Sequence, residues 1–219
     1  MLLTGFPAGL LACNCYVLAP HAGADAIVVD PGQRAMGPLR RILDENRLTP
    51  AAVLLTHGHI DHMWSAQKVG DTYGCPVFIH PEDRFMLADP IRGFGPRLGQ
   101  IAFGALFREP REVVELDRDG DKLDLGGITM VVDHTPGHTR GSVTFRVTGE
   151  DVAFTGDTLF KQSVGRTDLP GGSGRDLLGS IVDKLLVLDD DTRVLPGHGE
   201  STTIGQERRS NPFLKGLTL

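Results

Sequence analysis

Short apolar runs, five to seven residues long, recur along the chain and predict its β-strands. They cover residues 15–19, 26–30, 52–56, 76–80, 128–134, 142–147, 151–155 and 192–196. Several of these runs are continuously apolar instead of alternating with polar residues, which is typical of strands that are covered on both faces. The pattern therefore predicts sheets that lie between other layers of structure.

Three segments between these runs carry apolar residues at helical spacing, namely 36–47, 61–74 and 175–188. The first half of the chain thus alternates strands with helices, whereas residues from about 112 to 155 predict an antiparallel meander. Another helix and strand follow. We therefore predict an α/β fold in which mixed sheets carry helices on their outer faces.

Residues 88–111 contain three prolines and four glycines and are predicted to form a long connection between the halves. Loops of this length without regular structure commonly act as lids or substrate loops. A chain of 219 residues can bury one sizeable core, so we expect a single domain over residues 1–219.

Composition narrows the classes of function. A net charge of -6 argues against nucleic-acid binding, and no apolar run approaches the ~20 residues that cross a bilayer. The N-terminus lacks a positively charged leader. Cys13, Cys15 and Cys75 are odd in number and have no CxxC spacing, so we expect buried free thiols and a cytoplasmic location. Composition leaves the oligomeric state open.

Candidate chemistry lies directly after the strands. Four predicted strands each end in a histidine or aspartate beside a glycine: the segment THGHIDH (56–62), then His138, Asp157 and His198. In mixed α/β sheets, ligand sites gather outside strand ends, where loops converge. Asp30, in VVDPG, ends another strand and is predicted to be a turn or supporting residue.

Imidazole and carboxylate groups together bind Zn²⁺, Fe²⁺ or Mn²⁺, and no cysteine is placed to narrow the choice. His57 and His59 are two residues apart, so in extended backbone both project to the same side and can reach one ion. Asp61 and His62 are adjacent and could serve a second ion ~3.5–4 Å away, with Asp157 bridging the two. His21, His80 and His134 lie outside this pattern and are predicted to be structural or solvated, with His134 also a possible partner of a ligand.

The motifs THGHIDH, TPGHT, GDTLF and PGHG, in this order, resemble the metallo-β-lactamase superfamily over nearly the whole chain. The resemblance implies an αββα sandwich of two mixed sheets with a dinuclear metal site between them. It also implies that one ion takes His57, His59 and His138, that the other takes Asp61, His62 and His198, and that Asp157 bridges them.

Within that superfamily, GDTLFKQSVGRTDLPGG (156–172) is similar to the glyoxalase II-like, hydroxyacylglutathione hydrolase group. The resemblance implies hydrolysis of a small-molecule thioester, such as an S-(2-hydroxyacyl)glutathione, by a hydroxide that bridges two divalent ions. Zinc is the expected metal, with iron or manganese as alternatives. Asp61 is the candidate catalytic residue, because it can orient the hydroxide or take its proton.

The chain also departs from glyoxalase II. That enzyme uses a lysine and a tyrosine for glutathione, where this sequence has Arg166 and Asp168. Arg166 keeps a positive charge and, with Lys161, is a predicted substrate-binding residue. Only 21 residues follow His198, so we expect no C-terminal glutathione-binding helical domain, as in the short single-domain bacterial members. The acyl group and the thiol carrier therefore stay open.

Three other functions compete with the thioesterase. The first is a mononuclear iron persulfide dioxygenase of the same superfamily, whose iron is held by two histidines and an aspartate. The second is a hydrolase that acts on a lactone, phosphodiester or β-lactam. The third is a binding module with an inactive site. The complete set of seven candidate ligands favours hydrolysis with two ions.

Overall fold

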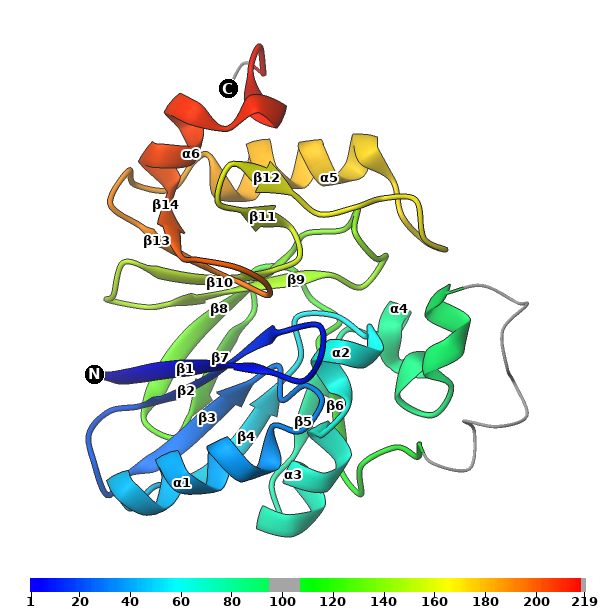
Figure 1. Ribbon diagram of the computed structural model, residues 1–219. Coiled ribbons are helices and arrows are strands. Elements are labelled where there is room, and N and C mark those ends of the chain that lie inside the picture. The colour runs from blue at the N-terminus through cyan, green and yellow to red at the C-terminus, as the bar shows by residue number, and fades with distance from the viewer. Residues whose placement is uncertain (95–106, 218–219) are drawn as a thin grey trace.

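The computed structural model describes residues 1–94 and 107–217. Two six-stranded mixed sheets are stacked face to face, and helices lie on the outer face of each sheet (Figure 1). This arrangement confirms the predicted αββα sandwich. Among the described residues, no helix is both long and apolar enough to span a bilayer.

The first sheet has the strand order β1-β2-β3-β4-β5-β6. Its strands are β1 (Leu2–Ala8), β2 (Cys13–Ala19), β3 (Asp25–Val29), β4 (Thr49–Leu54), β5 (Val77–Ile79) and β6 (Val113–Glu115). Strands β1 to β3 are antiparallel, whereas β3 to β6 run parallel because helices form the connections between them. The helices of this half are α1 (Met36–Asn46), α2 (Ile60–Met63) and α3 (Ala66–Tyr73), of which α1 and α3 cover the outer face (Figure 1).

The second sheet has the strand order β14-β13-β10-β9-β8-β7. Its strands are β7 (Lys122–Leu125), β8 (Ile128–His134), β9 (Val143–Val147), β10 (Val152–Gly156), β13 (Arg193–Pro196) and β14 (Thr202–Thr203). Outside this sheet lie α5 (Gly174–Ser180), which continues as η3 (Ile181–Leu185), then α6 (Ile204–Ser210) and η4 (Pro212–Leu214). A small hairpin of β11 (Leu159–Phe160) and β12 (Ser163–Val164) follows β10.

The described part of the long connection begins with helical turns. It forms α4 (Pro81–Arg84), η1 (Phe85–Leu87) and η2 (Pro90–Phe94). The predicted lid or substrate loop at 88–111 falls partly on residues 95–106, which lie outside the described residues. The chain then returns through β6, which pairs parallel with β5 in the first sheet. The predicted meander from residue 112 is therefore wrong at its start, and the antiparallel strands begin only at β7.

The strands of the first sheet are covered on both faces. In β3, Ala26 and Val28 pack into the cluster beneath α1 and α3, whereas Ile27 and Val29 face the second sheet. This alternation explains why the run reads as continuously apolar. The three cysteines are free and buried, as predicted.

Candidate metal centre

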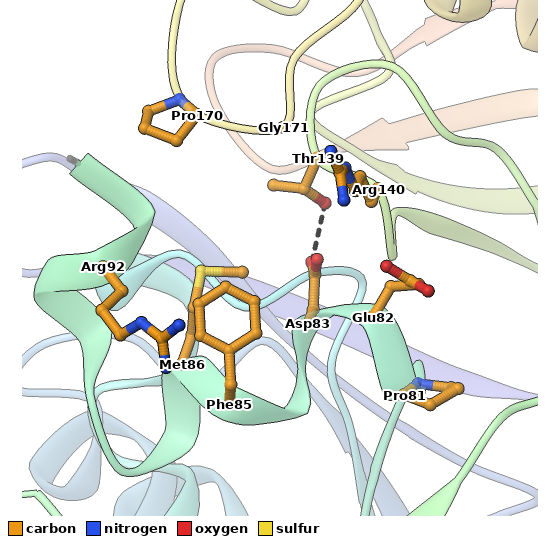
Figure 2. A pocket seen from close by; sticks show the side chains of 10 residues that line it. All are labelled: Pro81, Glu82, Asp83, Phe85, Met86, Arg92, Thr139, Arg140, Pro170 and Gly171. Atoms are coloured by element: carbon orange, nitrogen blue, oxygen red, sulfur yellow. Dashed lines mark hydrogen bonds between the residues drawn. The ribbon is translucent and has the colours of Figure 1, made fainter. Parts of the chain in front are cut away.

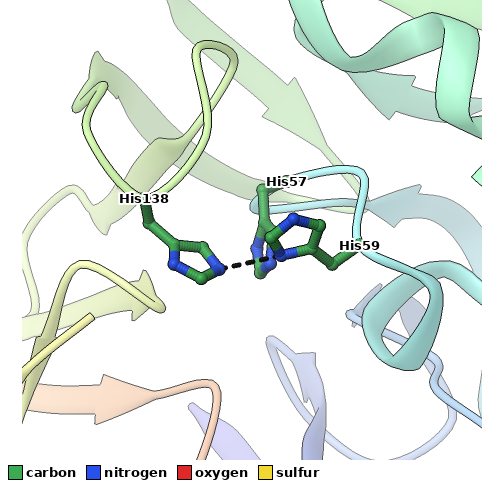
Figure 3. Close-up of side chains that lie close together, drawn as sticks. All are labelled: His57, His59 and His138. Carbon is green, nitrogen blue, oxygen red and sulfur yellow. Dashed lines mark hydrogen bonds between the residues drawn. The ribbon is translucent and has the colours of Figure 1, made fainter. Parts of the chain in front are cut away.

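All seven candidate ligands gather at one end of the two sheets, where four strand ends meet. They come from the turn after β4 and from helix α2 that follows it, from the loops after β8 and β10, and from the turn after β13. Figure 3 shows His57 and His59 on one loop facing His138 on another, from the opposite sheet. The loops converge because the two sheets are stacked with these ends together.

His57, His59 and His138 form one group, whose ligand atoms lie within 4.8 Å of one another. Nδ1 of His59 is 2.9 Å from Nε2 of His138. A tetrahedral zinc ion with Zn–N bonds of ~2.0–2.1 Å separates its nitrogen ligands by about 3.3 Å. The spacing of these nitrogens is therefore close to what such an ion requires.

Asp61, His62 and His198 form a second group of the same compactness. Nε2 of His198 is 3.1 Å from Oδ2 of Asp61 and 3.3 Å from Nε2 of His62. Helix α2 begins after its N-cap residue His59 and carries Asp61 and His62. The ring of His62 lies beside that of His57, with centroids 4.0 Å apart, and His57, His62 and Asp157 also form a compact group that links the two positions. The spacing HxHxDH thus divides its ligands between two neighbouring positions.

Asp157 lies between the two groups. Its Oδ1 is 3.4 Å from Nε2 of His62, while its Oδ2 is 3.6 Å from Nε2 of His138 and 3.7 Å from Nε2 of His198. The carboxylate therefore reaches histidines of both groups. This is the position that a bridging ligand of a dinuclear site would take.

The buried nitrogens fit a metal ion. Nε2 of His57 is buried and has no hydrogen-bond partner in the described part of the chain, an arrangement that is costly unless another partner binds there. Burial lowers the pKa of His57 well below its ordinary range and that of His59 to about 3. Both imidazoles are therefore neutral at pH 7, as metal ligands must be.

The carboxylates of the centre remain ionised. Burial raises the pKa of Asp61, but its hydrogen bond with His198 and the charge of His62 outweigh burial, so that the pKa falls. Burial also raises the pKa of Asp157, yet His62 and His138 lower it further than burial raises it. The centre thus combines the neutral imidazoles of His57 and His59 with anionic oxygens, a donor set that suits a divalent ion. Burial lowers the pKa of His62 and of His198, but neighbouring anionic groups outweigh burial and raise it, so these two rings have to release a proton before they bind an ion.

Other groups fix the orientation of the histidines. Asp30 is buried, has a left-handed backbone at φ 47°, and accepts hydrogen bonds from the backbone N–H and hydroxyl of Thr56. Its Oδ2 also lies 2.9 Å from Nδ1 of His62. His138 and His198 direct their Nδ1 atoms at the carbonyl oxygens of Arg166 and Leu11, at 2.8 and 3.0 Å. Such contacts select the ring nitrogen that faces a metal.

The predicted substrate-binding residues lie in different places. Arg166 lines a cavity of about 470 Å³ that contains Asp61 and Asp157 and has apolar walls. The guanidinium pairs with Asp168 at 2.7 Å. Lys161 is not among the lining residues of this cavity, and its ammonium pairs with Glu200.

The three remaining histidines lie outside both groups. His21 is exposed, and the ring of His80 stacks on that of His134 with centroids 4.2 Å apart. His134 also binds the carbonyl oxygen of Arg140 through Nε2. Sequence reasoning did not find Asp83, a buried carboxylate that joins two of the ligand loops, because nothing in HPED distinguishes it from an ordinary helix start.

Two stacked mixed sheets with outer helices define an αββα protein, and the histidine and aspartate clusters at the strand ends fit a divalent-metal site. The chain belongs to the metallo-beta-lactamase superfamily, because the sequence model of that family matches residues 8–198. Members of this superfamily bind divalent metals and are typically hydrolases.

Three similar proteins illustrate the range of the family. The chain is 38% identical over 195 residues to hydroxyacylglutathione hydrolase GloC of Haemophilus influenzae, with 87% of each protein covered. Its sequence is 40% identical to that of the BLEG-1 B3 metallo-beta-lactamase, whose crystal structure matches this one with a TM-score of 0.84. The match covers 98% of this chain and 100% of that one. The chain is 34% identical to TTHA1623 in a di-iron-bound form, with a TM-score of 0.80, covering 96% of this chain and 100% of that one.

Proposed function

We propose that the protein is a metal-dependent thioesterase that hydrolyses S-(2-hydroxyacyl) thioesters of a small-molecule thiol. The observation that carries the proposal is the pair of complete ligand groups spanned by Asp157, opening into a cavity that also holds Arg166. The similarity to hydroxyacylglutathione hydrolase GloC supports a thioester substrate.

Two divalent ions, with zinc expected and iron or manganese as alternatives, would be held by the two groups with Asp157 between them. When bound, such ions supply a nucleophile from water at neutral pH and polarise the acyl carbonyl. The di-iron form of TTHA1623 supports two ions and leaves their identity open.

The residues of the chain hold and orient the reactants. Asp61 keeps a carboxylate at the cavity, with Oδ2 3.1 Å from Nε2 of His198, and this carboxylate can accept a hydrogen bond from the attacking water. Leu11, Phe160 and Leu169 line the cavity and offer apolar surface to an acyl chain. Arg166 offers a guanidinium to a carboxylate of the substrate.

Metal analysis of purified protein, coupled to thioester hydrolysis with several thiol carriers, tests this function. We expect two equivalents of metal and turnover with at least one carrier. His59→Ala should lose metal and thioesterase activity, because it removes a nitrogen of the first group, whereas the exposed His21→Ala should keep both. Full turnover by a metal-stripped His59→Ala protein would overturn the proposed mechanism.

The rival functions give different results in the same assays. One equivalent of iron with oxygen uptake on a glutathione persulfide would identify a persulfide dioxygenase. The similarity to the BLEG-1 enzyme makes a β-lactam a necessary member of the substrate panel, together with a lactone and a phosphodiester. Hydrolysis of one of these substrates without thioester turnover would replace the thioesterase.

A further inference from the structure

Asp83, in helix α4, contacts both loops that carry the first group of histidines. Its Oδ2 accepts a hydrogen bond from the backbone N–H of Gly58 at 2.9 Å and from the hydroxyl of Thr139 at 2.7 Å. Its Oδ1 accepts one from the backbone N–H of Gly141 at 3.0 Å. Figure 2 shows the Asp83 carboxylate on helix α4 pointing at the hydroxyl of Thr139, which lies in the loop after β8. One side chain thus connects segments that are far apart in the sequence.

The partners of Asp83 are immediate neighbours of the histidines. Gly58 lies between His57 and His59, and Thr139 directly follows His138. The two loops come from different sheets. Their relative position therefore decides how far the nitrogens of His57 and His59 lie from that of His138.

The carboxylate of Asp83 is suited to a fixed role. It is 1% exposed, and all three of its contacts are donors, an arrangement that suits the acceptor oxygens of a carboxylate. Ser142 lies 2.8 Å from the Thr139 hydroxyl and so supports its orientation. Burial raises the pKa of Asp83, and the hydrogen bonds from Thr139, Gly58 and Gly141 oppose that rise.

Two glycines leave room for this contact. A Cβ atom added to Gly58 would lie 2.9 Å from the carbonyl oxygen of Asp83, and one added to Gly141 would lie 2.7 Å from its Cγ. Both backbone segments therefore approach Asp83 more closely than a residue with a side chain would allow. The sequence around each ligand loop is thus adapted to this carboxylate.

We propose that Asp83 is a positioning residue that sets the distance between the two halves of the first group, His57 and His59 on one loop and His138 on the other. The proposal rests on the metal site of the proposed function but on no particular substrate. Asp61, His62 and His198 are oriented by other contacts, from Asp30 to His62 and from the Leu11 carbonyl to His198. The effect of Asp83 should therefore fall on one of the two metal positions.

The test is a titration of the metal-free protein with Zn²⁺ in competition with a chromogenic chelator, on wild type and Asp83→Asn. The amide of asparagine has one acceptor oxygen and turns an NH₂ group towards a backbone donor, so the loops lose part of their shared anchor. We expect one of the two equivalents to bind about 10–100-fold more weakly and the other to be unchanged. Glu82→Gln, at the exposed neighbouring position on the same helix, should bind both equivalents like the wild type.

Two results would overturn the proposal. Unchanged binding of both equivalents would show that Asp83 does not position the ligands. Equal weakening of both, with lowered thermal stability of the metal-free protein, would show that it only supports the fold. If Asp83→Asn does not fold, Thr139→Val removes one of the three bonds and should weaken the same single equivalent to a smaller extent. Because the readout is metal affinity, it stays informative if no thioester is hydrolysed.

Discussion

At the scale of single residues, the Asp30 carboxylate illustrates how an acceptor decides which nitrogen a histidine presents. It binds the backbone N–H and hydroxyl of Thr56 and lies 2.9 Å from Nδ1 of His62. The side chain in Asp30→Asn has one acceptor oxygen fewer, so the ring of His62 should lose its fixed orientation. Metal binding at the second group should then weaken about 10–100-fold. The same chelator competition measures this, with the exposed Asp25→Asn as the matched control. Wild-type affinity in Asp30→Asn would contradict the role.

Arg166 and Lys161 allow a paired comparison at the same scale. Arg166 lines the cavity of the metal centre, whereas Lys161 does not line it and pairs with Glu200. Arg166→Gln should raise KM for thioesters whose carrier bears a carboxylate by about 10-fold and leave the metal content unchanged, because a charged hydrogen bond contributes ~1.5–3 kcal/mol. Lys161→Gln should leave KM near the wild-type value. Steady-state kinetics on both variants would show which of the two residues binds the substrate. A larger rise in KM for Lys161→Gln than for Arg166→Gln would assign substrate binding to Lys161 instead.

The candidate ligands, their order and their position after strands could be named from the sequence, because each depends on a local motif, and the structure brings these residues together. The contacts that support them could not. Asp83 meets Gly58 across 25 residues and Thr139 across 56, and the carbonyl oxygen of Leu11 meets His198 across 187. Such pairs are set by the stacking of the sheets, and a single sequence contains no local pattern that reports them.

At the scale of elements, apolar runs placed the eight predicted strands correctly, since burial on both faces leaves a strong signal. The predicted helix over 61–74 is in fact two helices, α2 and α3, which Trp64 and Ser65 separate. The hydroxyl of Ser65 donates to the carbonyl oxygen of Gly32, a contact from outside the segment. Short strands such as β6 and β14 are defined by pairing with neighbours more than by their own composition.

An ion-pair cluster joins helix α4 to the segment in which the long connection returns to the sheet. Arg84 binds Glu109 through two hydrogen bonds, of 3.0 and 2.8 Å, and these hydrogen bonds lower the pKa of Glu109. A lowered folded-state pKa means that the stabilisation is present above the ordinary glutamate range and is lost as the pH falls through the lowered value.

Arg84→Gln should therefore be less stable than the wild type at neutral pH and equally stable in acid, where Glu109 is protonated. Both side chains are more than a third exposed, at 38% and 37%, so solvent screening keeps the difference below about 1 kcal/mol. Urea unfolding at neutral and at acidic pH measures it. A difference that grows in acid would contradict the assignment. Arg118→Gln is a suitable control, since Arg118 is exposed and has no ion-pair partner within 4.0 Å among the described residues.

At the scale of the whole molecule, we expect the candidate metal centre to depend on the core between the sheets, because this core joins the two sheets whose loops carry the candidate ligands. Residues of both sheets share one buried cluster, to which β4 contributes Leu54 and β9 contributes Phe145. The next strand along, β10, contributes Phe154. Sequence patterns predicted the layers, but they could not predict which side chains meet across the interface.

Phe145→Ala tests this dependence, because Phe145 is fully buried between the sheets. Removing a buried phenyl ring should lower the free energy of unfolding by about 3–5 kcal/mol. Phe213→Ala, at a side chain that is 54% exposed, should change it by only about 0.5 kcal/mol. Denaturant unfolding of the metal-free proteins measures both.

If the core sets the spacing of the ligand loops, the folded fraction of Phe145→Ala should also bind both metal equivalents more weakly, unlike Asp83→Asn, which should affect only one. Wild-type affinity for both would show that local contacts such as those of Asp83 and Asp30 position the ligands without help from the packing between the sheets.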